Sequence, residues 1–243
     1  MLEKIKQNKV YKWLDNYWYH YKWVTLVSTF FIIVFSVLTA QMLTKEKPDS
    51  VILYGGPAAL TANETRDLET AFKSILPSDF NADGKKLVQL EAVSLMTEDQ
   101  VAEAEAKAAE DSSVFVYNSK ALGSNKTTFT QLLMSGEYVI LLVDPAQYDD
   151  ILDSGALVPL ADIFEENDMP DCAYDDCAIV FSETAFAQYY NGSTAALPDD
   201  TLLCVLRESE NSLFKGKEKA DTQYRQQLLL YKKIVNFSKG KSK

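Results

Sequence analysis

The stretch WVTLVSTFFIIVFSVLTAQML begins at Trp23, ends at Leu43, and contains no charged residue, no proline and no glycine. Because a helix rises about 1.5 Å per residue, this stretch forms about 32 Å of helix, close to the thickness of the hydrocarbon core of a bilayer. We therefore expect a single transmembrane helix over residues 23–43 that contacts the lipid bilayer and divides the chain into two unequal parts.

The charges that flank this stretch predict its orientation. Residues 1–22 contain five lysines and two acids, whereas Lys45 and Lys47 follow the stretch. An excess of lysine and arginine marks the cytoplasmic side of a membrane segment. We expect residues 1–22 to form a cytoplasmic foot rich in aromatic and basic residues, residues 44–50 to be a linker, and the rest to lie outside the cell. The chain would then be a single-pass protein of the cell membrane.

A cleaved signal peptide is the alternative interpretation of the same stretch. The apolar core of a signal peptide has about 7–15 residues and ends at a cleavage site made of small residues. The stretch here is longer, and Thr39-Ala40-Gln41 is a poor match to such a site. The sequence therefore favours an anchor that stays in the mature protein.

Residues 48–243 are strongly acidic, with 17 Lys and Arg against 32 Asp and Glu and hence a net charge of −15. A surface of this charge repels nucleic acid, which we exclude as a partner. The length is that of one domain with a sizeable core.

The only histidine of the chain is His20, in the foot. The predicted outer domain therefore lacks the imidazole that Ser-His-Asp and Cys-His nucleophile systems and histidine-ligated zinc sites require. We expect no enzyme, no metal and no cofactor. A hydrolase that uses two carboxylates is the remaining enzymatic alternative.

The three cysteines, Cys172, Cys177 and Cys204, are candidates for a disulfide, which conditions outside the cell would permit. Cys172 and Cys177 would close a small loop, or one of them would pair with Cys204. The odd number leaves one thiol over, and the chain has no CxxC motif that would indicate redox chemistry.

Strand and helix patterns alternate after the apolar stretch. The spacing predicts strands at 51–54, 87–93, 113–117, 138–143, 177–181 and 201–206, with helices between them and a last helix over 218–237. Residues 138–143 are apolar at every position, as in a strand buried on both faces of a parallel sheet. We expect an α/β fold with a mostly parallel sheet and helices on both faces.

One part of this pattern resembles extracellular solute-binding proteins of the type 2 periplasmic-binding fold. The resemblance rests on Ser135-Gly136-Glu137, on the strand from Tyr138 to Val143 followed by Asp144, and on the segment Gly155-Ala-Leu-Val-Pro-Leu160. The complete chain also resembles short, membrane-tethered, uncharacterised proteins of Gram-positive anaerobes. The second resemblance implies no activity.

The solute-binding resemblance implies two lobes with a ligand between them. Residues 51–238 are short for two full lobes. We therefore expect a complete first lobe over 51–164, a reduced second lobe over 165–238, and a basic tail over 239–243.

Ligands of open α/β sheets bind beyond the carboxyl ends of the strands. This rule points to a set of candidate ligand-binding residues at the ends of the predicted strands: Tyr54, Gly55, Gly56, Asn118, Asp144 and Tyr148. Each also has a simpler structural interpretation, since paired glycines make turns and Asp144 before Pro145 is a helix N-cap.

These observations predict a membrane-anchored, non-enzymatic binding module for a small solute, a peptide or a partner in the cell envelope. The alternative is a structural or accessory subunit of a membrane or envelope complex, with no small-molecule ligand. The binding module predicts a concave, partly apolar pocket with a few polar groups, and the accessory subunit predicts a broad exposed apolar patch.

Overall fold

The structure is a computed structural model that describes residues 9–44, 46–110, 119–208 and 216–238. It divides into two compact units, Met1–Lys47 and Pro48–Lys243. The predicted strand at 113–117, the candidate residue Asn118 and the basic tail at 239–243 lie outside the described residues.

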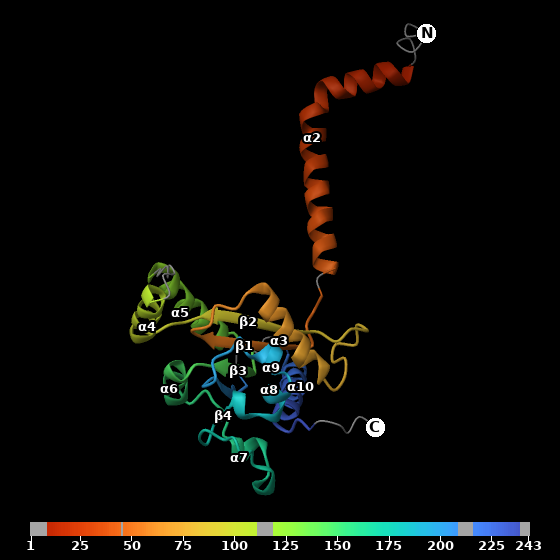
Figure 1. Ribbon diagram of the computed structural model, residues 1–243. Coiled ribbons are helices and arrows are strands. Elements are labelled where there is room, and N and C mark those ends of the chain that lie inside the picture. The colour runs from red at the N-terminus through yellow and green to blue at the C-terminus, as the bar shows by residue number, and fades with distance from the viewer. Residues whose placement is uncertain (1–8, 45, 111–118, 209–215, 239–243) are drawn as a thin grey trace. The chain divides into compact units, whose positions relative to one another are not determined.

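A single helix, α2 (Lys9–Thr44), makes up the described part of the first unit. It is longer than the predicted span because residues 9–22 are helical too, with neither proline nor glycine to stop the helix. Its part from Lys12 to Gln41 is long and apolar enough to cross a membrane. Figure 1 shows that α2 bends sharply between a short N-terminal arm and a longer straight part. We use the name arm for residues 9–22, which precede the apolar stretch.

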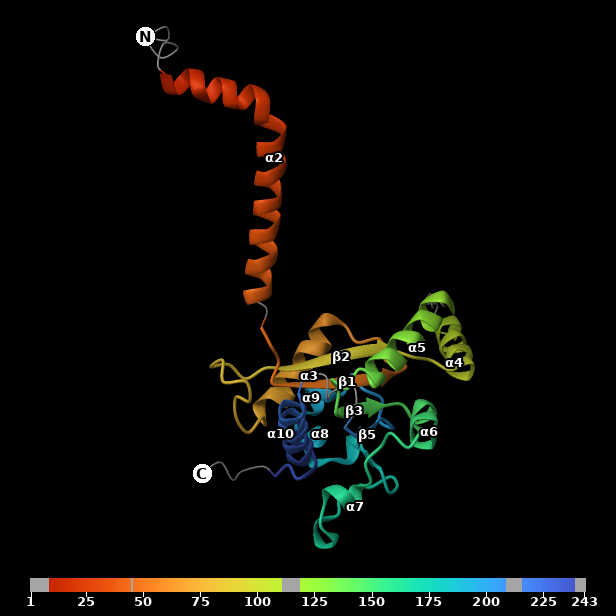
Figure 2. The same cartoon turned by 180° about the vertical axis from the view of Figure 1, so that it is seen from behind.

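The second unit contains a five-stranded sheet in the order β2-β1-β3-β5-β4 (Figures 1 and 2). The strands are β1 (Ser50–Gly56), β2 (Val88–Ser94), β3 (Ile140–Val143), β4 (Ala178–Val180) and β5 (Leu202–Val205). β1 pairs in parallel with β2 and with β3, whereas β5 runs antiparallel to both β3 and β4. The sheet is therefore mixed, and the mostly parallel character expected from the sequence is not confirmed.

Helices cover both faces of the sheet, as the α/β pattern predicts. They are α3 (Ala62–Ser74), α4 (Glu98–Glu110), α5 (Ser119–Met134), α6 (Pro145–Asp153), α7 (Leu160–Ile163), α8 (Ala185–Tyr189), α9 (Asn191–Thr194) and α10 (Lys217–Val235), with 3₁₀ turns at Glu166–Asp168 and Phe181–Glu183. Ile52 and Tyr54 face a core shared with α3, α7, α8 and α10. Leu53 faces a second core shared with α5 and α6. Alternation along each strand separates these two cores.

Local sequence signals set the start of two helices. Thr61 and Glu64 form a complete capping box at the start of α3. The side chain of Asp144 caps α6 by accepting a hydrogen bond from the Ala146 N–H, and Pro145 occupies the first helical position. These caps fix where α3 begins after β1 and where α6 begins after β3.

Both predicted lobes contribute strands to this one sheet. β1, β2 and β3 come from residues 51–164, and β4 and β5 come from residues 165–238. Leu203 and Val205 of β5 share a core with Ile52 of β1. The pairing of β5 with β3 therefore joins the two predicted lobes in one sheet, within one compact unit over the described part of 48–243.

Candidate functional site

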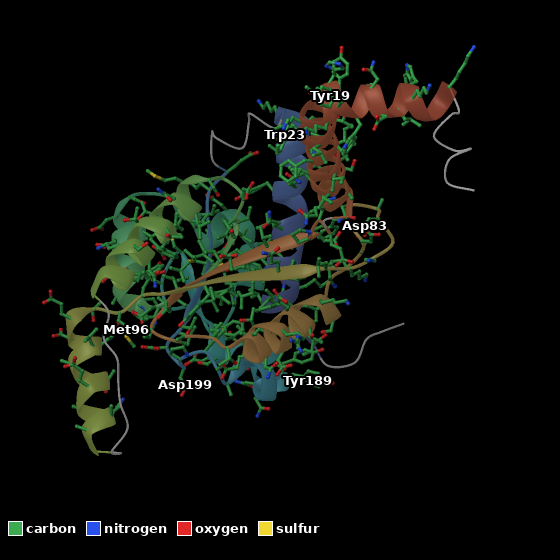
Figure 3. The ribbon with its side chains drawn as sticks, turned by 90° about the horizontal axis from the view of Figure 1, so that it is seen from above. Tyr19, Trp23, Asp83, Met96, Tyr189 and Asp199 are labelled. Carbon is green, nitrogen blue, oxygen red and sulfur yellow. The ribbon has the colours of Figure 1, made fainter. Side chains whose placement is uncertain are left out.

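The predicted site lies at the carboxyl edge of the parallel strands, where β1, β2 and β3 end. Figure 3 orients the sheet, with Asp83 in the loop before β2 at one end and Met96 after β2 at the other. At this edge the Leu95 N–H donates to the Gly56 carbonyl (2.7 Å) and the Asp144 N–H donates to the Gly55 carbonyl (2.9 Å). The structure therefore brings the ends of the three strands together.

Internal packing accounts for Tyr54, Gly55 and Gly56. The Tyr54 side chain is fully buried, and its hydroxyl accepts a hydrogen bond from the Ala58 N–H at 3.0 Å. A Cβ on Gly55 would lie 2.3 Å from the Phe129 ring, and a Cβ on Gly56 would lie 2.6 Å from the Tyr54 hydroxyl. Both glycines are thus required by neighbouring side chains of the same domain rather than by a ligand.

Asp144 is also occupied within the fold. One carboxylate oxygen caps α6, and the other accepts a hydrogen bond from the Gln100 amide of α4 at 3.0 Å. Burial raises the pKa of Asp144 above its ordinary value, and the charge of Asp200 acts in the same direction, although the Ala146 and Gln100 donors oppose the shift. The carboxylate therefore links α4 to the end of β3.

Tyr148 points away from this edge, toward the loop that precedes β4. Its hydroxyl lies 2.7 Å from both carboxylate oxygens of Asp175 and donates to that carboxylate. The same Asp175 accepts hydrogen bonds from the N–H groups of Cys177 and Ala178. Because Tyr148 is buried, its hydrogen bond with Asp175 holds the segment that leads into β4 and does not serve to bind a ligand.

Two side chains outside the candidate ligand-binding set make hydrogen bonds at the carboxyl edge. Gln100 reaches Asp144, and Asn125 of α5 donates to the Ser94 carbonyl at the end of β2 (2.9 Å). Thr97-x-x-Gln100 has the spacing of a capping box, and both of its hydrogen bonds are present: the Thr97 N–H donates to the Gln100 side chain and the Gln100 N–H donates to the Thr97 hydroxyl. Its second contact, across 44 residues to Asp144, has no sequence signal.

The opposite end of the sheet carries an open groove of about 630 Å³. It lies beside the start of β4, where the Leu160 N–H donates to the Asp176 carbonyl and the Val158 N–H donates to the Val205 carbonyl. Its walls come from α6, α7 and the acidic segment before β4, and they are formed by Leu152, Pro159, Ala161, Met169, Asp175, Asp176 and Cys177. We name this feature the β4 groove.

The chemistry of the β4 groove is apolar contact combined with negative charge. Leu152, Pro159 and Met169 supply carbon surface, and Asp176 is exposed. Burial raises the pKa of the Cys177 thiol, and the carboxylates of Asp175 and Asp176 raise it further. The thiol therefore stays protonated at neutral pH and is a weak nucleophile.

The disulfide candidates Cys172, Cys177 and Cys204 are all free thiols in the structure. Cys177 and Cys204 lie in the core on the α5 and α6 side of the sheet, whereas Cys172 packs against the core on the other side. Cys172 and Cys177, one of the two pairings considered, therefore lie on different sides of the sheet. Cys204 is fully buried in β5, which raises its pKa.

A second, more polar hollow of about 410 Å³ lies beside the same acidic segment, lined by groups that include Asp168, Asp171 and Glu183. Among the residues that the structure describes, no three His, Cys, Asp or Glu side chains are placed to hold a metal ion. This hollow therefore offers carboxylates without a coordination site.

The acidic residues of 165–176 and the segment Leu157-Val-Pro-Leu160 are each visible in the sequence as short local patterns. Their meeting at the β4 groove depends on β5 pairing with β3 and β4, which the sequence pattern does not specify.

Comparison of the chain with models of protein families, with curated proteins and with solved structures found no match.

Proposed function

We propose that this chain is a membrane-anchored, non-enzymatic binding module whose acidic α/β domain lies outside the cell and takes a cationic, partly apolar ligand in the β4 groove. The β4 groove is the observation that carries this proposal. Its volume falls within the range of ligand sites, and it combines apolar walls with a few polar groups.

The charge of the domain selects the class of ligand. Residues 48–243 have a net charge of −15, and the ionisable side chains that line the β4 groove are Asp175, Asp176 and Cys177. An amine or guanidinium group would meet the exposed carboxylate of Asp176 while its carbon skeleton covers Leu152 and Met169. The open form of the groove favours a short basic peptide or an amine-bearing solute.

The anchor part of the proposal rests on the exposure of α2. Phe30, Phe31 and Ile32 are each more than 60% exposed, an apolar surface that water disfavours and lipid accepts. The hydroxyls of Ser36 and Thr39 donate to carbonyls one turn earlier in the helix, so they are satisfied without water. A retained anchor with the N-terminus in the cytoplasm agrees with the lysine distribution.

The resemblance to solute-binding proteins supports recognition of a solute, but one layered body cannot enclose it between two lobes. A surface groove predicts modest affinity and ready exchange with solution. We therefore favour capture of a ligand near the membrane over its sequestration.

A thermal-shift measurement on residues 48–243 tests the groove. The probes are two hexapeptides of alternating leucine with lysine or with glutamine. At about 100 times Kd, the lysine peptide stabilises the domain by about 2.7 kcal/mol and raises Tm by about 5–10 °C. Asp176→Asn reduces this shift, whereas Asp149→Asn, which removes an equal charge from exposed α6 surface, leaves it unchanged. Equal shifts in Tm with both peptides, or in both variants, would contradict the proposal that the β4 groove binds a cationic ligand.

Topology is tested separately by adding protease to intact cells. Digestion of the domain with retention of α2 in carbonate-washed membranes supports the anchor. Protection of the domain, or recovery of a chain that lacks α2, contradicts it.

An accessory subunit is the second candidate, favoured by an aromatic cluster at the surface. The Tyr189 ring lies 4.7 Å from that of Tyr190 and 5.3 Å from that of Phe237, and Tyr189 is 48% exposed. Such a cluster fits a protein contact. Crosslinking of membranes through position 189 to one partner, with no peptide-dependent thermal shift, would select this candidate.

A further inference from the structure

A side-chain hydrogen bond spans the bend in α2. Residues eight apart in a straight helix are separated by about 12 Å along the axis. The Tyr17 hydroxyl nevertheless lies 3.0 Å from Thr25 Oγ1. Since α2 contains no proline or glycine, this hydrogen bond across the inside of the bend joins the arm to the straight part of the helix.

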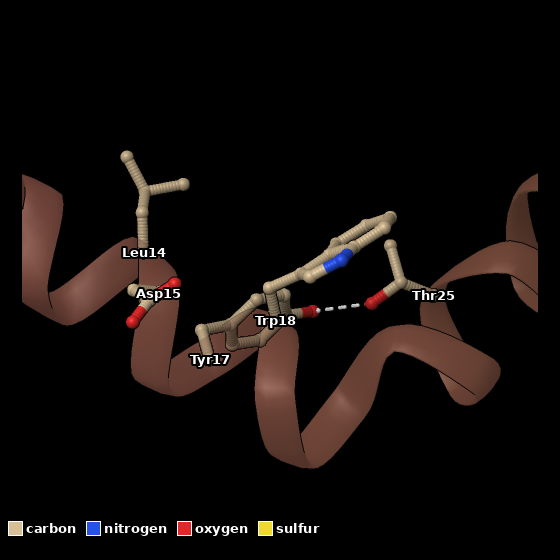
Figure 4. Close-up of a pocket in the computed structure, with 5 residues that line it drawn as sticks. All are labelled: Leu14, Asp15, Tyr17, Trp18 and Thr25. Carbon is tan, nitrogen blue, oxygen red and sulfur yellow. Dashed lines mark hydrogen bonds between the residues drawn. The ribbon is translucent and has the colours of Figure 1, made fainter.

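The inner side of the bend is mostly aromatic and apolar. Leu14, Tyr17 and Trp18 line a pocket there together with Thr25 and one acid, Asp15, which also borders the polar side of the arm. Figure 4 shows the Tyr17 hydroxyl and the Trp18 indole both reaching toward Thr25. Trp13, Tyr17 and Tyr21 stack at four-residue spacing, with centroids 5.8 and 5.3 Å apart, and form one stripe along the arm. The stripe therefore lies on the inner side of the bend, the side toward which the straight part of α2 extends.

The other side of the arm is polar and basic. A shallow hollow of about 320 Å³ on the arm is lined by Lys12, Asp15, Asn16, Trp18, Tyr19 and Lys22. With Lys9, the described arm has three lysines against the single carboxylate of Asp15. A helix with aromatic residues on one face and lysines on the other has the pattern of a segment that lies in the membrane interface.

We propose that the arm lies flat on the cytoplasmic surface of the membrane and binds anionic phospholipids. This inference rests on the proposed membrane anchor and adds a lipid partner to it. If the straight part of α2 crosses the bilayer, the inner side of the bend faces the bilayer, so the stripe of Trp13, Tyr17 and Tyr21 enters the headgroup layer. The lysines lie at the level of the lipid phosphates, where their charges are complementary.

The position of Trp13 distinguishes an arm that lies flat on the membrane from an arm that continues the straight helix away from the membrane. Trp13 precedes Trp23 by ten residues, so in a straight helix it would stand about 15 Å further from the membrane, in water. In the bent helix it lies beside the headgroups. The chain has only three tryptophans, which makes single-tryptophan proteins practical.

The test uses the full chain in vesicles of phosphatidylcholine with phosphatidylglycerol. One protein keeps Trp13 and carries Trp18→Phe and Trp23→Phe. The matched control replaces all three tryptophans by Phe and carries Tyr19→Trp on the polar side of the arm. We expect brominated lipid to quench Trp13 and acrylamide to quench it several-fold less than the tryptophan at position 19. Equal acrylamide quenching at both positions would overturn the flat arm.

Lipid charge is tested by adding Lys9→Gln and Lys12→Gln to the Trp13 protein. Acrylamide quenching should rise in the anionic vesicles and stay unchanged in phosphatidylcholine alone. If acrylamide quenching does not rise in anionic vesicles, the arm does not bind anionic lipid. If Trp13 is protected from acrylamide but is not quenched by brominated lipid, a protein rather than lipid covers the stripe, which also contradicts the proposal. Resistance of the same proteins to carbonate extraction reports the anchor independently, so each proposal can fail alone.

Discussion

The two ends of the sheet differ in how their polar groups are used. At the carboxyl edge, Asp144 caps a helix and accepts from Gln100, and Gly55 leaves room for the Phe129 ring. At the other end, the exposed residue Asp176 lines the β4 groove. The residue types that the sequence marks as a binding edge here make contacts within the domain. The β4 groove instead lies where segments that are not adjacent in the sequence meet.

The largest effect that this comparison predicts comes from Gly55→Ala. The new Cβ would collide with the Phe129 ring, and overpacking of this kind costs about 3 kcal/mol. Phe129→Leu in the same chain should restore part of the loss, because the two positions share one contact. Urea unfolding measures both. As a control, Gly192→Ala, whose Cβ meets nothing within 4 Å, should not destabilise the domain.

Asp144→Ala should cost about 2 kcal/mol, since the helix loses its N-cap and the Gln100 amide loses its acceptor. The control is Asp150→Ala, an exposed residue of α6, which should change stability by less than about 0.5 kcal/mol. Equal losses in the two variants would mean that the contacts of Asp144 contribute little.

The raised pKa of Asp144 also predicts a pH dependence. The folded state holds the proton more tightly than the unfolded state, so this carboxyl contributes stability below its ordinary pKa of 3.8. That contribution is lost as the pH rises from 3.8 through the folded-state pKa. Asp144→Asn keeps an N-cap acceptor without a charge, and its stability relative to the original chain should rise across that window and level off above it.

Tyr148→Phe should cost about 1–2 kcal/mol because it removes one donor to Asp175 while the two N–H donors remain. Tyr174, whose ring lies 6.0 Å from that of Tyr148, is exposed and provides the control. Tyr174→Phe should leave the midpoint of urea unfolding unchanged. A neutral Tyr148→Phe would mean that the loop before β4 does not need this bond.

The smallest effect on stability is expected at the β4 groove. Asp176→Asn should change the free energy of unfolding by less than about 0.5 kcal/mol, because the side chain is exposed. A loss above 1 kcal/mol would show that Asp176 serves the fold, and the contrast between the two ends of the sheet would disappear.

Much of the fold could be predicted because its signals are local. The capping box at Thr61, the N-cap at Asp144 and the uniformly apolar residues of β3 each act within a few residues. The mixed sheet could not be predicted in this way. Residues 202–205 have the pattern of a buried strand whichever direction they run, since the apolar run gives burial but no direction.

The candidate site was predictable only as a list of residue types. Tyr54, Asp144 and Tyr148 were selected because they follow strands, yet their partners Ala58, Gln100 and Asp175 decide their roles. For the distant partners Gln100 and Asp175, no spacing rule joins the pair. The same holds for the cysteines: Cys177 and Cys204 lie on one side of the sheet and Cys172 on the other, a placement that depends on strand register and that their spacing does not specify.

The sequence by itself determined the long apolar helix, the acidic charge of the remainder and the alternation of helices and strands, because hydrophobic length, charge and periodicity are properties of neighbouring residues. Only the tertiary structure decided the place of β5 between β3 and β4, the partners of Asp144 and Tyr148, and the β4 groove. Those features arise from contacts between segments far apart in the chain, and their free energy depends on packing that no local pattern encodes.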